Sequence, residues 1–265
     1  MIRGFYTSYN RSTQPKRYWA SIMWNSALGL MMGAGAIAAL WAGAANAGQD
    51  ECFNTKGDYS PKDALTACNR LIQKHPSNDS RLPDTLMARG NAYYELRDWE
   101  HAISDYSQSL QLRPDQADLL ENRGMAYQQT GLGEEAIADF SHALRLHPKA
   151  EIYFRRADAY ERALRDPRRA IQDLTAAIRL TPDYEDAFYD RGYCYGQIGN
   201  YQLAIADFSA AIRLNPNSAD AYYYRGVAYQ KMGNSDQAAA DRTTALHLDP
   251  HLLDRRRAAP TATTS

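Results

Sequence analysis

Five prolines recur at intervals of 34 residues along the chain. They are Pro114, Pro148, Pro182, Pro216 and Pro250. The same short apolar phrase precedes each of them, from Leu110-Gln-Leu before the first to Leu246-His-Leu before the last. A fixed period of this length is typical of a repeat protein, in which each unit buries its apolar face only against its neighbours. The period therefore excludes an ordinary globular arrangement before any other feature is considered.

Two further phrases keep the same period and predict two helices in each unit. The first starts at an arginine and ends at a tyrosine, as in Arg191-Gly-Tyr-Cys-Tyr; the second is Ala-Ile-x-Asp followed by an aromatic residue or leucine, as in Ala204-Ile-Ala-Asp-Phe. In the second phrase Ala204, Phe208 and Ala211 share one face of a helix. Short turns such as Gly199-Asn200 separate the helices, and the recurrent proline ends the second one. Strand patterns are absent, so the fold class is all-α.

These columns resemble the tetratricopeptide repeat (TPR) family, whose units are antiparallel helix pairs of 34 residues. The resemblance covers about residues 83–250. It implies a right-handed α-solenoid of tandem helix-turn-helix hairpins, in which small residues let neighbouring helices approach closely. Those small positions are Gly90, Gly124, Gly192 and Gly226 in the first helices and Ala102, Ala136, Ala170, Ala204 and Ala238 in the second. Cys194 stands in a column otherwise held by alanine, which predicts a small core residue.

The period divides the chain into a leader, a cap, five repeats and a tail. The expected bounds are 1–47 for a signal peptide, 48–82 for an N-terminal half-repeat, 83–116, 117–150, 151–184, 185–218 and 219–252 for the five repeats, and 253–265 for a disordered tail. Two irregularities interrupt the period. The first loop is four residues longer than expected, and the third repeat has one residue deleted after Pro148 and one inserted near Arg165.

The first 47 residues have the pattern of an export signal. They carry four basic and no acidic side chains, then an apolar stretch over 27–45, and Ala45-Asn46-Ala47 is a suitable cleavage site. An uncleaved membrane anchor is the alternative, because the apolar stretch approaches the length of a spanning helix. Either way the sequence predicts a periplasmic or secreted protein of a Gram-negative cell. The remainder is mildly acidic, which argues against a nucleic-acid partner.

Cys52 and Cys68 lie close together after the leader. In an oxidising compartment they are expected to form a disulfide that stabilises the fold by about 3 kcal/mol. The residues around Cys68 repeat the second-helix spacing once more, without a full first helix before them. The sequence therefore predicts a half-repeat cap pinned by this disulfide. At the other end, Arg242 replaces the aromatic residue of the last repeat, as suits a terminal helix on which nothing stacks.

Every repeat has an arginine in its first helix and an aspartate in its second. We expect them to form charge-assisted hydrogen bonds, either across the helix pair or across the stack, with a structural role. The pairs are Arg89 with Asp105, Arg123 with Asp139, Arg156 with Asp173, Arg191 with Asp207 and Arg225 with Asp241.

Motifs for catalysis are missing from the sequence. None of the six histidines has a zinc-binding spacing, and there is no nucleophile elbow, phosphate-binding loop or dinucleotide fingerprint. We therefore expect no enzyme activity, no cofactor and no metal.

The TPR resemblance implies instead that the first helices line a groove for a protein or peptide. The inward columns here are acidic and rich in tyrosine, which favours a basic segment or one containing proline or aromatic residues. The Asn91 column alone matches the carboxylate clamp of some relatives. The alternative function is a structural subunit that self-associates through the last repeat. The groove residues predicted are Asn91, Tyr94, Glu121, Met125, Asp158, Tyr189, Tyr193, Tyr223 and Tyr224.

Overall fold

The computed structural model describes residues 51–54, 57–74 and 80–258. Within those ranges all regular structure is helical, which confirms the all-α class. The expected signal peptide and residues 259–265 of the expected tail lie outside them. The helices are α3 (Pro61–Lys74), α4 (Leu82–Glu95), α5 (Trp99–Leu112), α6 (Ala117–Gln129), α7 (Gly133–Leu146), α8 (Ala150–Leu164), α9 (Pro167–Leu180), α10 (Glu185–Gln197), α11 (Tyr201–Leu214), α12 (Ala219–Lys231), α13 (Ser235–Leu248) and α14 (Leu252–Ala258).

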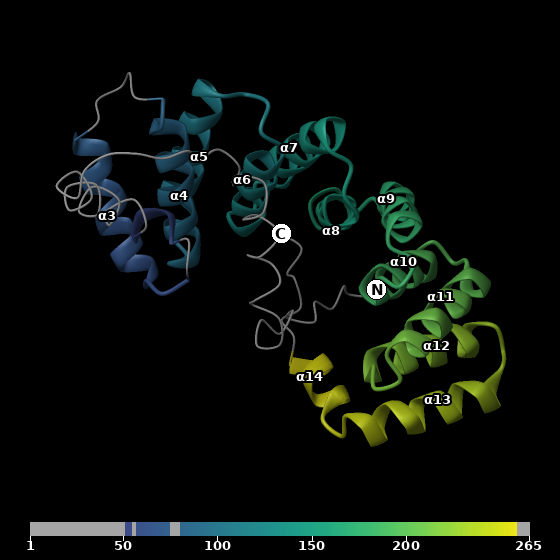
Figure 1. Ribbon diagram of the computed structural model, residues 1–265. Helices are drawn as coiled ribbons and strands as arrows, with labels where there is room; N and C mark the ends of the chain where they lie inside the picture. Colours follow the sequence, from purple (N-terminus) through teal and green to yellow (C-terminus); the bar gives the residue numbers. More distant parts are fainter. Residues whose placement is uncertain (1–50, 55–56, 75–79, 259–265) are drawn as a thin grey trace, which may run out of the picture. The chain divides into compact units, whose positions relative to one another are not determined.

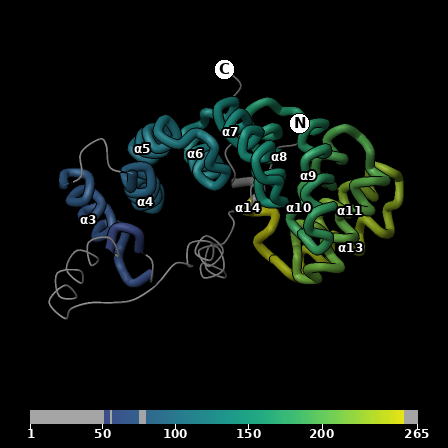
Figure 2. The backbone as a smooth tube through the Cα atoms, turned by 45° about the horizontal axis from the view of Figure 1, so that its top comes forward, coloured from purple at the N-terminus to yellow at the C-terminus, as the bar shows by residue number. Residues whose placement is uncertain are grey.

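The helices form two compact units, which meet in sequence between Thr130 and Gly131. The first unit contains α3–α6 and the second contains α7–α14. In the first unit each helix packs on the next, and in the second the same holds from α7 to α13. The helix pairs include α4 with α5, α8 with α9, α10 with α11 and α12 with α13. In the second unit, α8, α10 and α12 follow one another on the inner side and α9, α11 and α13 on the outer side (Figure 1). Figure 2 shows the succession of helices from α7 to α11 in a turned view. This is the predicted α-solenoid of stacked helix pairs.

The turn inside each helix pair uses a left-handed residue at the same repeat position. Three of these residues are glycine and two are arginine, a residue that rarely adopts positive φ. Their φ angles are 62° at Arg97, 79° at Gly131, 49° at Arg165, 79° at Gly199 and 81° at Gly233. The next residue often caps the second helix, as when the Asp166 carboxylate accepts from the backbone N–H groups of Arg168 and Arg169. The chain thus reverses direction at fixed intervals.

Helix pairs approach closely where the sequence has a small residue. A Cβ atom added to Gly90 would lie 2.6 Å from Cε1 of Tyr106, and one added to Gly192 would lie 3.2 Å from Phe208. Cys194 is also buried and its thiol is free. Burial raises the pKa of that thiol, so it is a core residue as predicted.

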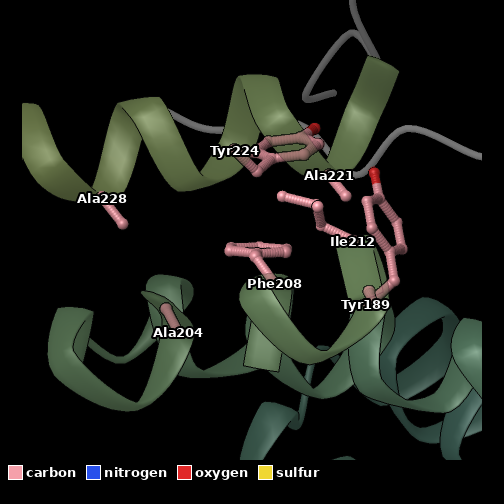
Figure 3. Packing of buried hydrophobic residues seen from close by; sticks show 8 residues of the cluster. Tyr189, Ala204, Phe208, Ile212, Ala221, Tyr224 and Ala228 are labelled. Carbon is pink, nitrogen blue, oxygen red and sulfur yellow. The ribbon is translucent and has the colours of Figure 1, made fainter. Parts of the chain in front are cut away.

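The best example of packing between repeats joins α10, α11 and α12. The rings of Phe208 and Tyr224 stack with centroids 5.9 Å apart, and Tyr189 meets both edge to face. Figure 3 shows Phe208 rising from α11 beneath the Tyr224 ring, with Ile212 beside them. The fourth repeat therefore contributes its aromatic residue Phe208 to an interface with the fifth.

The N-terminal half-repeat carries the predicted disulfide between Cys52 and Cys68, whose Cα atoms are 4.7 Å apart. Both cysteines are buried, together with Ala67 and Ala88. Residues 51–53 form one short helical turn, and Pro61 begins α3 directly after Ser60, whose hydroxyl accepts from the backbone of Asp63. The disulfide thus fixes a segment too short to hold a helix alone.

The C-terminal end differs from the prediction in one respect. Helix α13 exposes Arg242, as expected, and buries only Asp241 and Ala245. The residues after it continue as α14, with Leu252 only 1% exposed. The expected disordered tail is therefore helical over 253–258. A helix this short is unstable alone, and the burial of Leu252 at its first residue stabilises it. No helix in the described ranges is long and apolar enough to cross a membrane.

Candidate functional site

The arginine–aspartate column forms two-point ion pairs inside the helix pairs. In the fourth repeat, Arg191 donates to Asp207 through Nε at 2.7 Å and through Nη2 at 2.8 Å. The same geometry joins Arg89 with Asp105, Arg156 with Asp173 and Arg225 with Asp241. Hydrogen bonds to these aspartates raise the pKa of each of the four arginines. The Arg123–Asp139 pair would span the two units and stays a prediction.

Each arginine also bonds backwards to the preceding second helix. The Nη1 group of Arg191 donates to the Thr175 hydroxyl at 3.1 Å. The partners of the other arginines in the column are Asn69 for Arg89, Ser107 for Arg123, Ser141 for Arg156 and Ser209 for Arg225. The column therefore acts both across the helix pair and across the stack, the two alternatives that the sequence left open.

The predicted groove residues divide into two groups. Glu121, Met125, Tyr189 and Tyr224 are at most 9% exposed. Little of these four side chains is exposed, and the groove assignment at these positions stays a prediction; Tyr224 also lines the pocket described below. The four are largely covered because these columns face the neighbouring helices as well as the inner side. The five that keep some surface are Asn91, Tyr94, Asp158, Tyr193 and Tyr223.

Asn91 is already engaged within the first unit. Its side-chain oxygen accepts from the Tyr106 hydroxyl at 2.8 Å and from the Asn122 amide at 3.2 Å. Asn91 thus links α4 to α5 and α6, so its carbonyl oxygen already has two donors. The clamp-like column at this position therefore has a packing role in this chain.

Carboxyl groups gather between α8 and α10 on the inner side of the second unit. We call Asp158, Glu161, Glu185, Asp186 and Asp190 the acidic cluster. Burial, reinforced by the neighbouring carboxylates, raises the pKa of Asp190 to about 8, and burial with Asp186 raises that of Glu185 to about 7. Burial also raises the pKa values of Asp158 and Asp186. Carboxyl groups are therefore crowded here, and burial and their mutual repulsion oppose their ionisation.

One arginine and one amide belong to the same neighbourhood. Arg162 Nε lies 3.0 Å from a carboxylate oxygen of Asp158, and burial lowers the pKa of this arginine to about 10. The Gln197 amide donates to the Glu161 carboxylate at 2.9 Å, which connects α10 to α8. Sequence reasoning missed Glu161, Glu185 and Asp190. The available signal was that Glu185 and Asp190 occupy columns without an acidic residue in any other repeat.

An apolar pocket lies next to the acidic cluster, between α10, α11 and α12. Its walls include Tyr193, Gly196 and Gln197 from α10, Tyr201 and Phe208 from α11, and Val227 from α12. Gln197 is shared by the pocket and the bond to Glu161. Among the described residues no group of three or more histidine, cysteine, aspartate or glutamate side chains could hold a metal ion.

Three models of the repeat match consecutive parts of the chain. A tetratricopeptide repeat model matches residues 90–161, a second matches 150–184 and 219–251, and a TPR repeat model matches 192–233. The chain belongs to the tetratricopeptide repeat family. No curated protein matches this TPR protein in sequence.

Solved structures with the same fold include two of MamA and one of YrrB. One MamA structure is 28% identical, with 62% of this chain and 96% of MamA covered and a TM-score of 0.59. The other is 25% identical, with 70% and 100% covered and a TM-score of 0.62. YrrB, described as a TPR protein with an unusual peptide-binding site, is 23% identical, with 73% and 98% covered and a TM-score of 0.63.

Proposed function

We propose that this TPR protein is a non-enzymatic scaffold that binds a protein or peptide partner on the inner side of its helix pairs. The observation that carries the proposal is the acidic cluster beside an apolar pocket on α8, α10 and α12. Crowded carboxylates next to aromatic walls suit a basic segment with apolar or aromatic residues. YrrB, with its peptide-binding site, has the same fold, and this likeness is an analogy at the level of the fold.

The proposal includes a place outside the cytoplasm, in the periplasm or cell envelope. It is supported by the export pattern of 1–47 and by the Cys52–Cys68 disulfide, which is stable in an oxidising compartment. N-terminal sequencing of the protein from a fractionated cell tests this part. We expect a chain that begins at Gly48 in the periplasmic fraction, and an intact Met1 in the cytoplasm would contradict it.

Site-directed photo-crosslinking in intact cells tests the binding function. A photoreactive residue at Tyr223, on the inner helix α12, is expected to give a discrete adduct with a partner. The same residue at Gln237, exposed on α13, is the matched control and should give none. High salt during irradiation should weaken the adduct, because a charged encounter is screened. Equal adducts at both positions, or none at either, would contradict the proposal.

Self-association through the last repeat remains the alternative function. The outward face of α13 exposes Arg242 and Thr243 and lacks the aromatic residue of the inner repeats. A mass from light scattering that rises with protein concentration would support this alternative over a monomeric scaffold.

A further inference from the structure

Gly196 is a helical glycine that neither packing nor backbone conformation requires. A Cβ atom added to it would meet no other atom within 4 Å, whereas one added to Gly192 would press on Phe208 at 3.2 Å. Its φ is not positive, unlike that of Gly199 three residues later. A glycine in a helix destabilises it by about 0.5–1 kcal/mol relative to alanine. The fold therefore bears this cost without any structural gain at Gly196.

Comparison along the repeats shows that this glycine is specific to the fourth one. Counted from the repeated arginine, the same column holds Tyr94, Gln128, Glu161 and Gln230 in the other repeats. All four have long side chains. Gly196 instead lines the apolar pocket between α10, α11 and α12, where a long side chain would occupy the space. The missing side chain keeps this pocket open.

The pocket has an apolar wall and a polar edge. Phe208 and Val227 line it from two helices, and the buried hydroxyl of Tyr193 belongs to a third wall residue, on α10. A peptide carbonyl could accept from that hydroxyl. Gln197 ends the pocket on the side of α8 and donates to Glu161, so the edge continues directly into the acidic cluster.

We propose that this pocket receives an apolar side chain of an extended peptide whose adjacent lysine or arginine lies on the acidic cluster. The inference rests on the proposed peptide-binding function and names its ligand. The acidic cluster selects the charge, because a cation of the peptide would stabilise the ionised form of these crowded carboxyl groups, of which Asp158 lies 3.0 Å from Arg162. Lys231, exposed on α12, also lines the pocket, and its charge would repel a basic residue placed beside it and favour placement toward α8.

The experiment pans a phage-displayed library of random peptides against the immobilised full chain. Three variants are panned in parallel. Gly196→Phe fills the pocket, and Gly196→Ala is its matched control because the added Cβ has open space. Glu161→Gln combined with Asp190→Asn removes two ionisable carboxyl groups of the acidic cluster while keeping shape. Thermal unfolding followed by circular dichroism confirms that each variant is folded. The best synthetic peptide is then titrated by calorimetry.

The parent chain and Gly196→Ala should enrich peptides that contain a basic residue beside leucine, isoleucine, methionine or phenylalanine. Gly196→Phe should bind the synthetic peptide at least about tenfold more weakly, the equivalent of one lost buried side chain. The charge variant should lose about tenfold for the basic peptide and nothing for a copy with glutamine in place of the basic residue.

The outcomes separate the two proposals. If the parent chain enriches no peptide at all, the proposed function fails and this inference fails with it. If peptides are enriched but Gly196→Phe binds them as tightly as Gly196→Ala does, the pocket is wrong and the binding function stands. If the charge variant keeps its preference for basic residues, the acidic cluster is not the recognition element.

Discussion

The fourth and fifth repeats are built on the same sequence plan and yet pack very differently. Helix α11 buries six residues, with Phe208 at 2% exposure, whereas α13 buries only Asp241 and Ala245. The difference comes from the next helix: α12 packs on α11, while Arg242 of α13 replaces the aromatic residue and faces solvent. Short helices gain little stability from their own helix propensity, so packing against the following repeat supplies most of the stability of an inner repeat.

Removing the aromatic residue of the inner repeat should have the largest effect. We expect Phe208→Ala to lower the free energy of unfolding by about 3–5 kcal/mol, because it leaves a cavity under Tyr224. The matched change Arg242→Ala should alter it by less than about 0.5 kcal/mol, since that side chain is exposed. Denaturant unfolding followed by circular dichroism measures both. Equal losses would show that α13 is covered in solution.

The ion pairs should show no such difference between the two repeats. Asp207→Ala and Asp241→Ala should each cost about 2–3 kcal/mol, because both aspartates are 6% exposed and hold their arginines through two bonds. Double-mutant cycles with Arg191→Ala and Arg225→Ala should give coupling energies above about 1 kcal/mol in both cases. If the losses of unfolding free energy in the single variants simply add in the double variants, the arginine–aspartate pairs have no energetic role.

Stability should depend on pH through the fourth repeat and not the fifth. Asp190, with a folded pKa of about 8, and Glu185, at about 7, bind protons more tightly than in the unfolded chain, where such groups titrate near pH 4. The folded state therefore holds more protons in this window, and the free energy of unfolding falls as pH rises from about 4 to about 8. We expect a fall of at least about 1 kcal/mol between pH 5 and 8, measured by denaturant titration.

Two variants make this pH test specific. Asp190→Asn should flatten the profile, whereas Asp236→Asn, at an exposed position of α13, should leave it unchanged. A profile that keeps its slope in Asp190→Asn would place the responsible groups elsewhere.

The smallest difference concerns the helical glycines. Gly196→Ala should stabilise the protein by about 0.5–1 kcal/mol, because the methyl group meets nothing and the unfolded chain loses freedom. Gln230→Ala, in the same column of the fifth repeat, should change stability by less than about 0.5 kcal/mol. Gly226→Ala should destabilise, since its Cβ would lie 3.2 Å from the Ala238 carbonyl oxygen. A lower free energy of unfolding in Gly196→Ala would show that the space beside Gly196 is filled in solution.

Much of the fold could be predicted from the sequence, because the same residue types recur at the same positions in each repeat and so indicate the same packing. The close helix approach at Gly90, the Cys52–Cys68 bridge and the arginine–aspartate pairs all followed from columns or spacing. Helix α14 could not be predicted, because a helix of seven residues depends on tertiary contacts, here the burial of Leu252, and these are not visible in the sequence.

The candidate site was less predictable for a related reason. Tyr189 and Tyr224 lie in columns that face both the inner side and the next helix, and only their packing shows which of the two surfaces they meet. The acidic cluster depends on how closely α8 approaches α10, a distance that no single column records. The pocket arises at Gly196, where the fourth repeat has glycine in a column of long side chains. Repeat patterns are recognised from residues that recur, so a single exception of this kind gives no signal.

The three-point contact of Arg89, Arg156, Arg191 and Arg225 has a consequence for exchanging repeats between proteins. The arginine lies 16 residues from its aspartate in most pairs and 17 in the Arg156 pair, and its upstream partner is 16, 15 or 20 residues away. The length changes are thus confined to the turns, while the bonded atoms keep their arrangement. A foreign repeat should therefore join this solenoid if it brings the arginine and aspartate and meets a hydroxyl or amide upstream, whatever the length of its loops.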